Sequence, residues 1–293
     1  MRKIVIKIKG GLGNQLFEYA AARRLALVND AELIIDDVTG FIRDSQFHRK
    51  YMLDRFNILA RKATPAERLE PFGRYRSKAM KWLSYFRHFE KRNYLEQEDC
   101  VFDERFLTLK VTGTVYLEGY WQSERYFKDV RHIIRNDLQI ITPTDKTNLN
   151  IAEKIRNSQS VALHVRQFDA VNNNNTRNIS TDYYRRAIIL MEERVKSPHY
   201  YIFSDDYRSV YAKLDLPKGR ATCISNNMGD ENAYADLWLM SQCKNIITAN
   251  STFSWWGAWL AENPGKIIIA PKNWYTRTEE DVCNLLPEEW HAL

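Results

Sequence analysis

The chain has 293 residues, of which 44% are hydrophobic and 13% aromatic, so it can bury one large core or two of ordinary size and is not a disordered chain. Its net charge of +6 comes from residues 1–145, because basic and acidic side chains balance in residues 146–293. No recognition module accompanies this basic surplus, so nucleic acid is not an expected partner.

Cysteine usage indicates a reducing, cytoplasmic compartment. Cys100, Cys223, Cys243 and Cys283 are spaced too far apart for a local redox or metal pair and do not resemble a disulfide framework. Lysines interrupt the apolar residues at the N-terminus, so neither a signal peptide nor a membrane anchor is expected. Two carboxylates such as those at 205 and 206 could hold a divalent metal, but the sequence lacks a DxD triplet, which disfavours this option.

Strand and helix patterns alternate from the N-terminus onwards. Residues 3–9 are strand-like, residues 14–29 are rich in Ala and Leu and predict a helix, and residues 32–36 predict a second strand. The first half therefore begins with a βαβ unit. Residues 41–106 do not follow the alternation, and the pattern predicts no detailed structure there.

A glycine-rich loop separates the first strand from the first helix. Glycines at this position let the backbone approach a phosphate or a sugar closely. We therefore take Gly11, Asn14 and Gln15 as candidate ligand-binding residues. A generic tight turn is the alternative, and the G-x-G-x-x-G spacing of a dinucleotide site is incomplete because Phe17 follows Leu16.

A basic amphipathic stretch covers residues 74–92. Its apolar side chains recur at helical spacing: Ala79, Trp82, Leu83, Phe86 and Phe89. We expect this stripe to pack against the core and to leave a solvated basic face. The alternative is a helix that lies on an anionic membrane, which would give peripheral membrane contact through residues 74–92.

The second half restarts the alternation after a polar segment, residues 141–148, that has the composition of a linker. Strands are predicted at 160–166, 200–203, 221–224, 245–248 and 266–270, and helices at 181–196, 231–243 and 253–261. The fold class is therefore α/β, with two Rossmann-like domains, 1–145 and 146–293, facing a cleft. Ligands bind at the carboxyl ends of such strands.

His164 and Arg166 end the strand that opens the second half. Strand alternation places both side chains on one face, where they could reach the same ligand. Arginine can bind a diphosphate through two parallel hydrogen bonds. The alternative is an ion pair between Arg166 and Asp169 that only holds the following loop.

Two further carboxylates are candidates. Asp205, in Ser204-Asp205-Asp206, follows a predicted strand and could hold ribose or base groups, although an aspartate there could equally cap a helix. Asp236 lies on a helix that is otherwise apolar at this point. A buried aspartate needs a partner, which could be an internal donor or a ligand such as a guanine edge.

Small hydroxyl residues lie between the last long strand and a tryptophan-rich helix. Ser251, Thr252 and Ser254 would sit at the helix N-terminus, whose N–H groups and positive dipole end attract an anion. A plain helix cap by Ser251 or Thr252 is the alternative. Taken with Arg166, the segment indicates a diphosphate site.

Six segments together resemble the α-1,2-fucosyltransferases of glycosyltransferase family 11. They lie at residues 10–17, 119–127, 164–166, 204–206, 235–243 and 251–256, in the family's order and across nearly the whole chain. The resemblance implies a GT-B architecture, GDP-β-L-fucose as donor, inversion at the fucose C1, and no obligatory metal or other cofactor. The second domain would bind the donor and the first would lie on the acceptor side.

The resemblance also implies roles for particular residues. Arg166 would hold the β-phosphate and stabilise the leaving GDP. The diphosphate would be cradled by Ser251, Thr252 and Phe253, with Asn14 approaching from the first domain. By analogy with more distant fucosyltransferases, His164 and Asp236 would contact the nucleoside.

One departure from the family concerns the residue after Arg166. The family usually has a second arginine where this chain has Gln167, which cannot neutralise charge. Arg177 is a candidate compensating cation. Asp169 is a candidate catalytic residue, either as general base or as the group that orients Arg166.

The expected activity is transfer of L-fucose to a hydroxyl, O2 of a galactoside, on an oligosaccharide or lipid-linked glycan. Two rivals remain at this point. One is a non-catalytic or altered-specificity nucleotide-sugar-binding relative, for which Gln167 would record the change. The other is a nicotinamide-dependent oxidoreductase that uses the glycine-rich loop.

Overall fold

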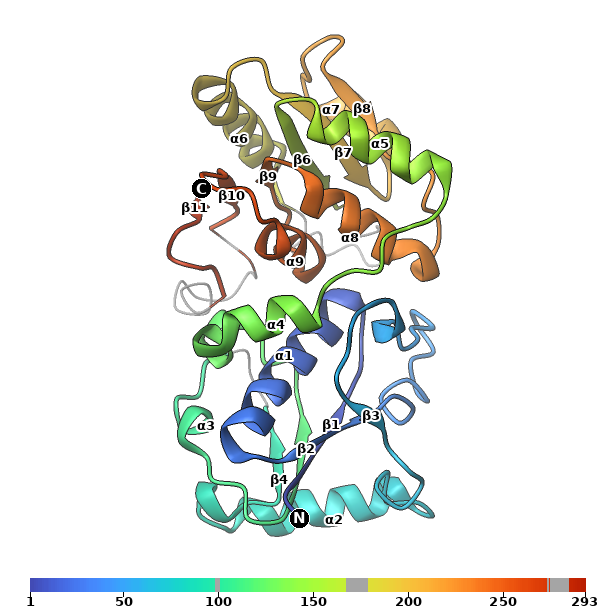
Figure 1. Cartoon of the computed structure of the whole chain (residues 1–293), viewed down its shortest axis with the longest axis vertical. Coiled ribbons are helices and arrows are strands. Elements are labelled where there is room, and N and C mark those ends of the chain that lie inside the picture. The colour runs from blue at the N-terminus through green and yellow to red at the C-terminus, as the bar shows by residue number, and fades with distance from the viewer. Residues whose placement is uncertain (98–100, 167–178, 273, 275–284) are drawn as a thin grey trace. The chain divides into compact units, whose positions relative to one another are not determined.

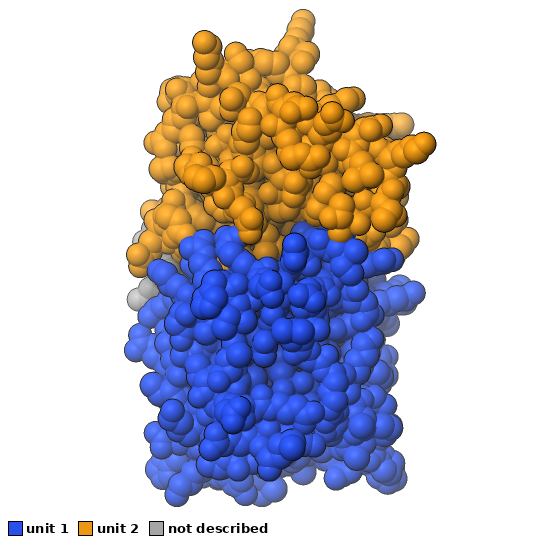
Figure 2. Space-filling model, in the orientation of Figure 1, with its two compact units in different colours: residues 1–141 blue, residues 142–293 orange. Residues whose placement is uncertain are grey.

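The computed structural model describes residues 1–97, 101–166, 179–272, 274 and 285–293. The chain divides into two compact units, Met1–Ile141 and Thr142–Leu293 (Figure 2). Each unit is a parallel sheet with helices packed on it (Figure 1). None of the helices in the described ranges combines the length and the apolar character needed to span a bilayer.

Unit 1 is built on five parallel strands in the order β3-β2-β1-β5-β4. The strands are β1 Lys3–Lys7, β2 Glu32–Asp36, β3 Arg61–Lys62, β4 Tyr94–Glu96 and β5 Thr114–Glu118. The α-helices are α1 Leu12–Asn29, α2 Gly73–Tyr85, α3 Arg105–Thr108 and α4 Arg131–Asp137. Short 3-10 helices occupy η1 Leu53–Arg55, η2 Phe89–Lys91, η3 Glu124–Tyr126 and η4 Lys128–Val130.

The predicted βαβ unit is confirmed as β1, α1 and β2. Helix α1 packs against β1 and β2 and begins at Leu12, two residues before the predicted start at Asn14. Gly10 has a φ of +73°, in the left-handed region, and this turn brings the chain from the strand into the helix. Four residues join the carboxyl end of β1 to the N-terminus of α1, and the last two of them are Gly10 and Gly11.

The orientation of helix α2 contradicts the prediction that its apolar stripe packs on the core. Trp82, Leu83 and Phe86 are 64%, 51% and 70% exposed, whereas the single buried residue of α2 is Ser84. The Ser84 hydroxyl donates to Asn93 Oδ1 (2.8 Å) and accepts from the backbone N–H of Tyr94 (3.2 Å). Polar bonding to the chain around β4, and not apolar burial, therefore fixes which face of α2 turns inward.

Unit 2 is built on six parallel strands in the order β11-β10-β9-β6-β7-β8. They are β6 Ser160–Val165, β7 His199–Ser204, β8 Ala221–Cys223, β9 Asn245–Ile247, β10 Ile268–Ala270 and β11 His291–Ala292. The helices are α5 Lys146–Arg156, α6 Thr181–Arg194, α7 Tyr207–Lys213, η5 Asp230–Asn232, α8 Ala233–Gln242 and α9 Thr252–Leu260.

The predicted strands and helices of the second half are confirmed, with ends shifted by one or two residues. The linker prediction for residues 141–148 is wrong in its second part. Asp145 accepts the backbone N–H of Asn148 (2.8 Å) and caps α5, so the helix already begins at Lys146. Polar composition alone did not distinguish a helix cap from a linker.

Candidate functional site

The strongest arrangement lies at the carboxyl end of the central strands of unit 2. Arg166 directly follows β6, and Ser251 precedes α9 after the neighbouring strand β9. Arg166 Nη1 donates to the Ser251 hydroxyl over 3.3 Å. Two segments 85 residues apart, each predicted from sequence to bind phosphate, therefore meet at one point.

Ser251 occupies the N-cap position of α9 without acting as a side-chain cap. Its backbone is extended, and its hydroxyl takes no capping hydrogen bond from the first turn of this helix. The Ser254 hydroxyl instead closes the turn, since it donates to the Ser251 carbonyl (3.3 Å) and accepts the Ala249 N–H (3.2 Å). The first-turn N–H groups of a helix have no acceptor inside the helix, and here the helix dipole and a guanidinium favour an anion.

His164 lies on the opposite face of β6 from Val165, as alternation predicts. Leu163 and Val165 belong to the core cluster under α6, whereas the His164 ring lies 5.8 Å from the Phe253 ring. Burial and the nearby positive Arg166 lower the pKa of His164 to about 3, so the ring is neutral at physiological pH. Its Nδ1 atom has no hydrogen-bond partner among the described residues, which leaves one ring nitrogen for a ligand.

Asp236 on α8 has the internal partner that its burial required. Asn227 Nδ2 donates to Asp236 Oδ1 (2.8 Å) and also to Asn148 Oδ1 (2.9 Å), which ties α8 to α5. Burial raises the pKa of Asp236 to about 7, against the lowering effect of the Asn227 bond, and the negative charge of Asp205 adds to the rise. Sequence reasoning missed Asn227, because a pair of asparagines in a loop carries no pattern that points to one partner.

The two aspartates after β7 have different environments. Asp206 caps α7, since its carboxylate accepts the N–H (3.1 Å) and the hydroxyl (2.6 Å) of Ser209. These bonds lower the pKa of Asp206. Asp205 is exposed and lies close enough to Asp236 to affect its pKa. The helix-cap alternative thus describes Asp206, and Asp205 is the one that can meet a ligand.

In unit 1 the glycine-rich loop meets the segment that follows β5. Gln122 Nε2 donates to Asn14 Oδ1 (2.9 Å), so two segments that resemble the same family lie together at the ends of neighbouring strands β1 and β5. A Cβ added at Gly11 would meet nothing within 4 Å. Gln122 was not singled out from sequence, although its segment was.

Gln15 has a structural role in this loop. Its side-chain N–H groups donate to the carbonyls of Gly10 (2.9 Å) and Lys50 (2.8 Å), and its Oε1 accepts the Met52 N–H (2.9 Å). The side chain is fully buried. Because these bonds commit both donors, Gln15 holds the loop in shape and does not offer a donor to a ligand, contrary to our prediction.

Three residues that were considered for the reaction from the sequence lie outside the described residues: Gln167, Asp169 and Arg177. The alternative ion pair between Arg166 and Asp169 falls there as well. Within the described ranges, no three His, Cys, Asp or Glu side chains gather in a way that could hold a metal ion.

Two α/β units, each with a parallel sheet and helices packed on it, are the architecture of the GT-B class of glycosyltransferases. Solved structures that share this fold include a NodZ and a FUT1. Fucosyltransferase NodZ from Bradyrhizobium has a TM-score of 0.50 at 11% identity, covering 87% of this chain and 91% of that one. A mutant of FUT1 from Arabidopsis thaliana, in complex with GDP, has a TM-score of 0.50 at 14% identity, covering 94% and 72%.

The chain belongs to glycosyltransferase family 11, since the model of that family, Glycosyl transferase family 11, matches residues 3–292. An alpha-1,2-colitosyltransferase from Escherichia coli is 30% identical over 99% of this chain and 98% of the relative. The O-antigen biosynthesis glycosyltransferase WbnK from Escherichia coli is 31% identical over 98% and 99%. The protein is therefore a glycosyltransferase that uses a nucleotide sugar, and the oxidoreductase alternative is wrong.

Proposed function

We propose that this glycosyltransferase moves L-fucose from GDP-β-L-fucose to O2 of a galactoside within a glycan acceptor, with inversion at C1 and without a metal. The observation that supports this most is the Arg166–Ser251 hydrogen bond at the N-terminus of α9. A guanidinium, a hydroxyl and a helix N-terminus together match a diphosphate leaving group. The fucosyltransferases that share the fold and the 1,2 linkage in the colitosyltransferase relative's name agree with the proposal.

The proposed reaction is a single displacement. An acceptor hydroxyl oxygen forms a bond to fucose C1 while the bond from C1 to the β-phosphate oxygen breaks, and that electron pair leaves with GDP. Arg166 neutralises the charge that develops on the diphosphate, and the first turn of α9 adds N–H donors through Thr252 and Phe253. The hydroxyl proton passes to a base, for which Asp169 is the proposed residue.

The nucleoside end of the donor is assigned to His164, Asp205 and Asp236. A neutral His164 can hydrogen-bond without repelling a cationic neighbour, and an ionised Asp236 can accept from the two N–H groups of a guanine edge. Gly11 and Asn14 of unit 1 are proposed as further donor-binding residues. In this proposal each residue acts through hydrogen bonding or charge.

The test is transfer from GDP-fucose to a galactoside, with the new linkage located by NMR. Arg166→Ala should lower kcat about a hundredfold or more, the scale of losing one oxyanion-stabilising donor. Arg156→Ala, an exposed arginine of the same unit, is the matched control. Near-normal turnover of Arg166→Ala would exclude the mechanism, and GDP binding without transfer from any donor would establish the non-catalytic alternative.

A second donor is favoured by one relative. The colitosyltransferase is 30% identical along nearly the whole chain, and colitose differs from L-fucose by loss of the 3-hydroxyl. Turnover of GDP-fucose and of GDP-colitose at equal concentrations decides between them. A kcat/KM at least about tenfold higher for GDP-colitose would replace fucose as the proposed donor, since tenfold is the worth of one hydrogen bond.

We further propose peripheral membrane contact through residues 74–92. The exposed face of α2 carries Tyr75, Trp82, Leu83 and Phe86, each more than half exposed, beside basic side chains that suit anionic lipids. Wild type should sediment with anionic vesicles at low salt. The double variant Trp82→Ala with Phe86→Ala should sediment less. The control replaces two exposed apolar residues of unit 2, Ile189 and Met228, and an equal loss there would exclude this surface.

A further inference from the structure

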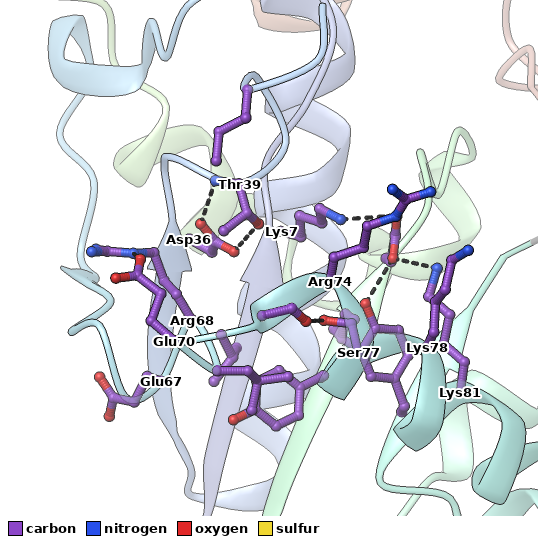
Figure 3. A pocket seen from close by; sticks show the side chains of 18 of the residues that line it. Lys7, Asp36, Thr39, Glu67, Arg68, Glu70, Arg74, Ser77, Lys78 and Lys81 are labelled. Atoms are coloured by element: carbon purple, nitrogen blue, oxygen red, sulfur yellow. Dashed lines mark hydrogen bonds and ion pairs between the residues drawn. The ribbon is translucent and has the colours of Figure 1, made fainter.

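Unit 1 contains a cavity that is lined by none of the residues assigned to the donor or to the transfer reaction. It has a volume of about 440 Å³, and its walls are the sheet on one side and α2 on the other. Figure 3 shows Lys78 and Lys81 of α2 at one side of this cavity and Glu67, Arg68 and Glu70 at the other. Cavities of a few hundred Å³ are the usual size for a small ligand.

The sheet face in this cavity carries a row of charged side chains at its carboxyl end. Register places Asp36 beside Lys7 and Glu96 beside Glu118, all at the carboxyl end of the sheet. Alternation puts these charged residues on the same face as Val5 and Tyr116, which lie two residues earlier along their strands. A parallel sheet covered on both faces is normally apolar throughout. The charges at this end of the sheet therefore need polar partners, either inside the unit or from a ligand.

The acidic side chains of the cavity already have partners inside the unit. Glu118 accepts from Lys7 (3.2 Å), Lys81 (2.7 Å) and the Tyr94 hydroxyl (2.7 Å). Burial opposes ionisation of Glu118, but the bonds from Lys81 and Tyr94 prevail and lower its pKa to about 2.

The other three carboxylates are engaged in the same way. Asp36 accepts backbone N–H groups from the following turn, Glu67 pairs with Arg61, and Glu70 pairs with Arg68. The acidic groups are therefore committed to holding the walls together.

The basic side chains exceed these acids. Six basic and four acidic residues line the cavity, and three of the six form no ion pair with any described residue: Arg43, Arg74 and Lys78. These three line the cavity and are exposed to solvent. Arg74 and Lys78 are four residues apart on α2, so they lie on one face of the helix, next to Lys81. The surplus charge available to a ligand is positive.

The inner wall adds groups that suit a sugar ring. The Tyr94 and Tyr116 rings stack with centroids 5.9 Å apart and planes inclined by 10°. Both line the cavity, together with the Ser77 hydroxyl on the inward face of α2. A flat aromatic wall beside a few polar groups is how pockets commonly hold a small polar ligand.

We propose that this cavity binds a saccharide that carries a phosphate ester, with the phosphate at Arg43, Arg74 and Lys78 and the sugar against the tyrosines. This deepens the proposed function, on which it rests, by giving the glycan acceptor an anionic group. It requires no donor and no transfer, so it is tested separately from them.

The probe is galactose 1-phosphate, titrated calorimetrically into the full-length protein, with inorganic phosphate and methyl galactoside as comparison ligands. Galactose 1-phosphate should bind at least about tenfold more tightly than either comparison ligand, because only it contacts both parts of the cavity. The double variant Arg74→Gln with Lys78→Gln should weaken its binding about 10- to 100-fold, the scale of one lost charge-assisted hydrogen bond. Excess GDP should not displace it.

The matched control is Arg87→Gln with Lys91→Gln, which removes the same charge from exposed positions just beyond α2 that do not line the cavity. Binding should survive in this control. An equal loss in both double variants, or displacement by GDP, would overturn the site. Inorganic phosphate binding as tightly as galactose 1-phosphate would overturn the saccharide, leaving a site for free phosphate.

Discussion

Asp236→Asn should make the protein more stable, and increasingly so as pH rises. Burial raises the pKa of Asp236 from its ordinary 3.8 to about 7 in the folded state. The folded protein therefore keeps a proton that the unfolded chain releases between these two values. Stability from this group is complete below pH 3.8 and is lost as pH rises towards 7.

The magnitude of this stability difference follows from the size of the pKa shift of Asp236. About three pKa units, at about 1.4 kcal/mol each, correspond to about 4 kcal/mol, which screening at a partly accessible side chain reduces to about 2 to 4 kcal/mol. An asparagine keeps an oxygen to accept the Asn227 N–H but carries no charge. The variant should equal wild type at about pH 4 and exceed it by this amount at about pH 8.

The assay is urea unfolding without nucleotide, comparing midpoints of wild type and variant across this pH range. Wild type and variant share all their other titratable groups, so the contributions of those groups cancel in the difference between the two stabilities. Asp206→Asn is the control of opposite sign, since the pKa of Asp206 is lowered by its bonds to Ser209. A stability difference for Asp236→Asn that does not change with pH would refute the reasoning.

Three further outcomes are expected. GDP affinity should fall as pH drops through about 7, because protonated Asp236 cannot accept both guanine donors, and Asp236→Asn should remove this dependence in calorimetric titrations. Gly10→Ala should cost about 1 kcal/mol in urea unfolding, since its φ is +73° and the new Cβ would lie 3.0 Å from Asn14 Nδ2, whereas Gly11→Ala should be tolerated. Gln122→Ala should raise the KM for GDP-fucose up to about tenfold with a smaller change in kcat, and an unchanged KM would show that it does not position Asn14.

Hydrophobic patterning predicted most of the fold, because buried strands of a parallel sheet are short apolar runs that can be read locally. It failed between residues 41 and 106, where β3 has two residues, β4 has three, and both lie at sheet edges. Hydrophobic patterning also predicted the wrong inward face for α2. The helical stripe of Trp82 and Phe86 is real, but the buried bonds of Ser84 to Asn93 and Tyr94 decide its orientation, and hydrophobicity does not encode such bonds.

The sequence by itself determined the α/β architecture, the family resemblance and the two phosphate-directed segments at Arg166 and Ser251. Only the tertiary structure joined those segments by a hydrogen bond, gave Asp236 its partner Asn227, and committed the Gln15 side chain to Gly10, Lys50 and Met52. The physical reason is the distance along the chain over which each effect acts. Strand and helix periodicity act between near neighbours, whereas a side chain's partner, burial and pKa depend on which distant segments the sheet brings to the same edge.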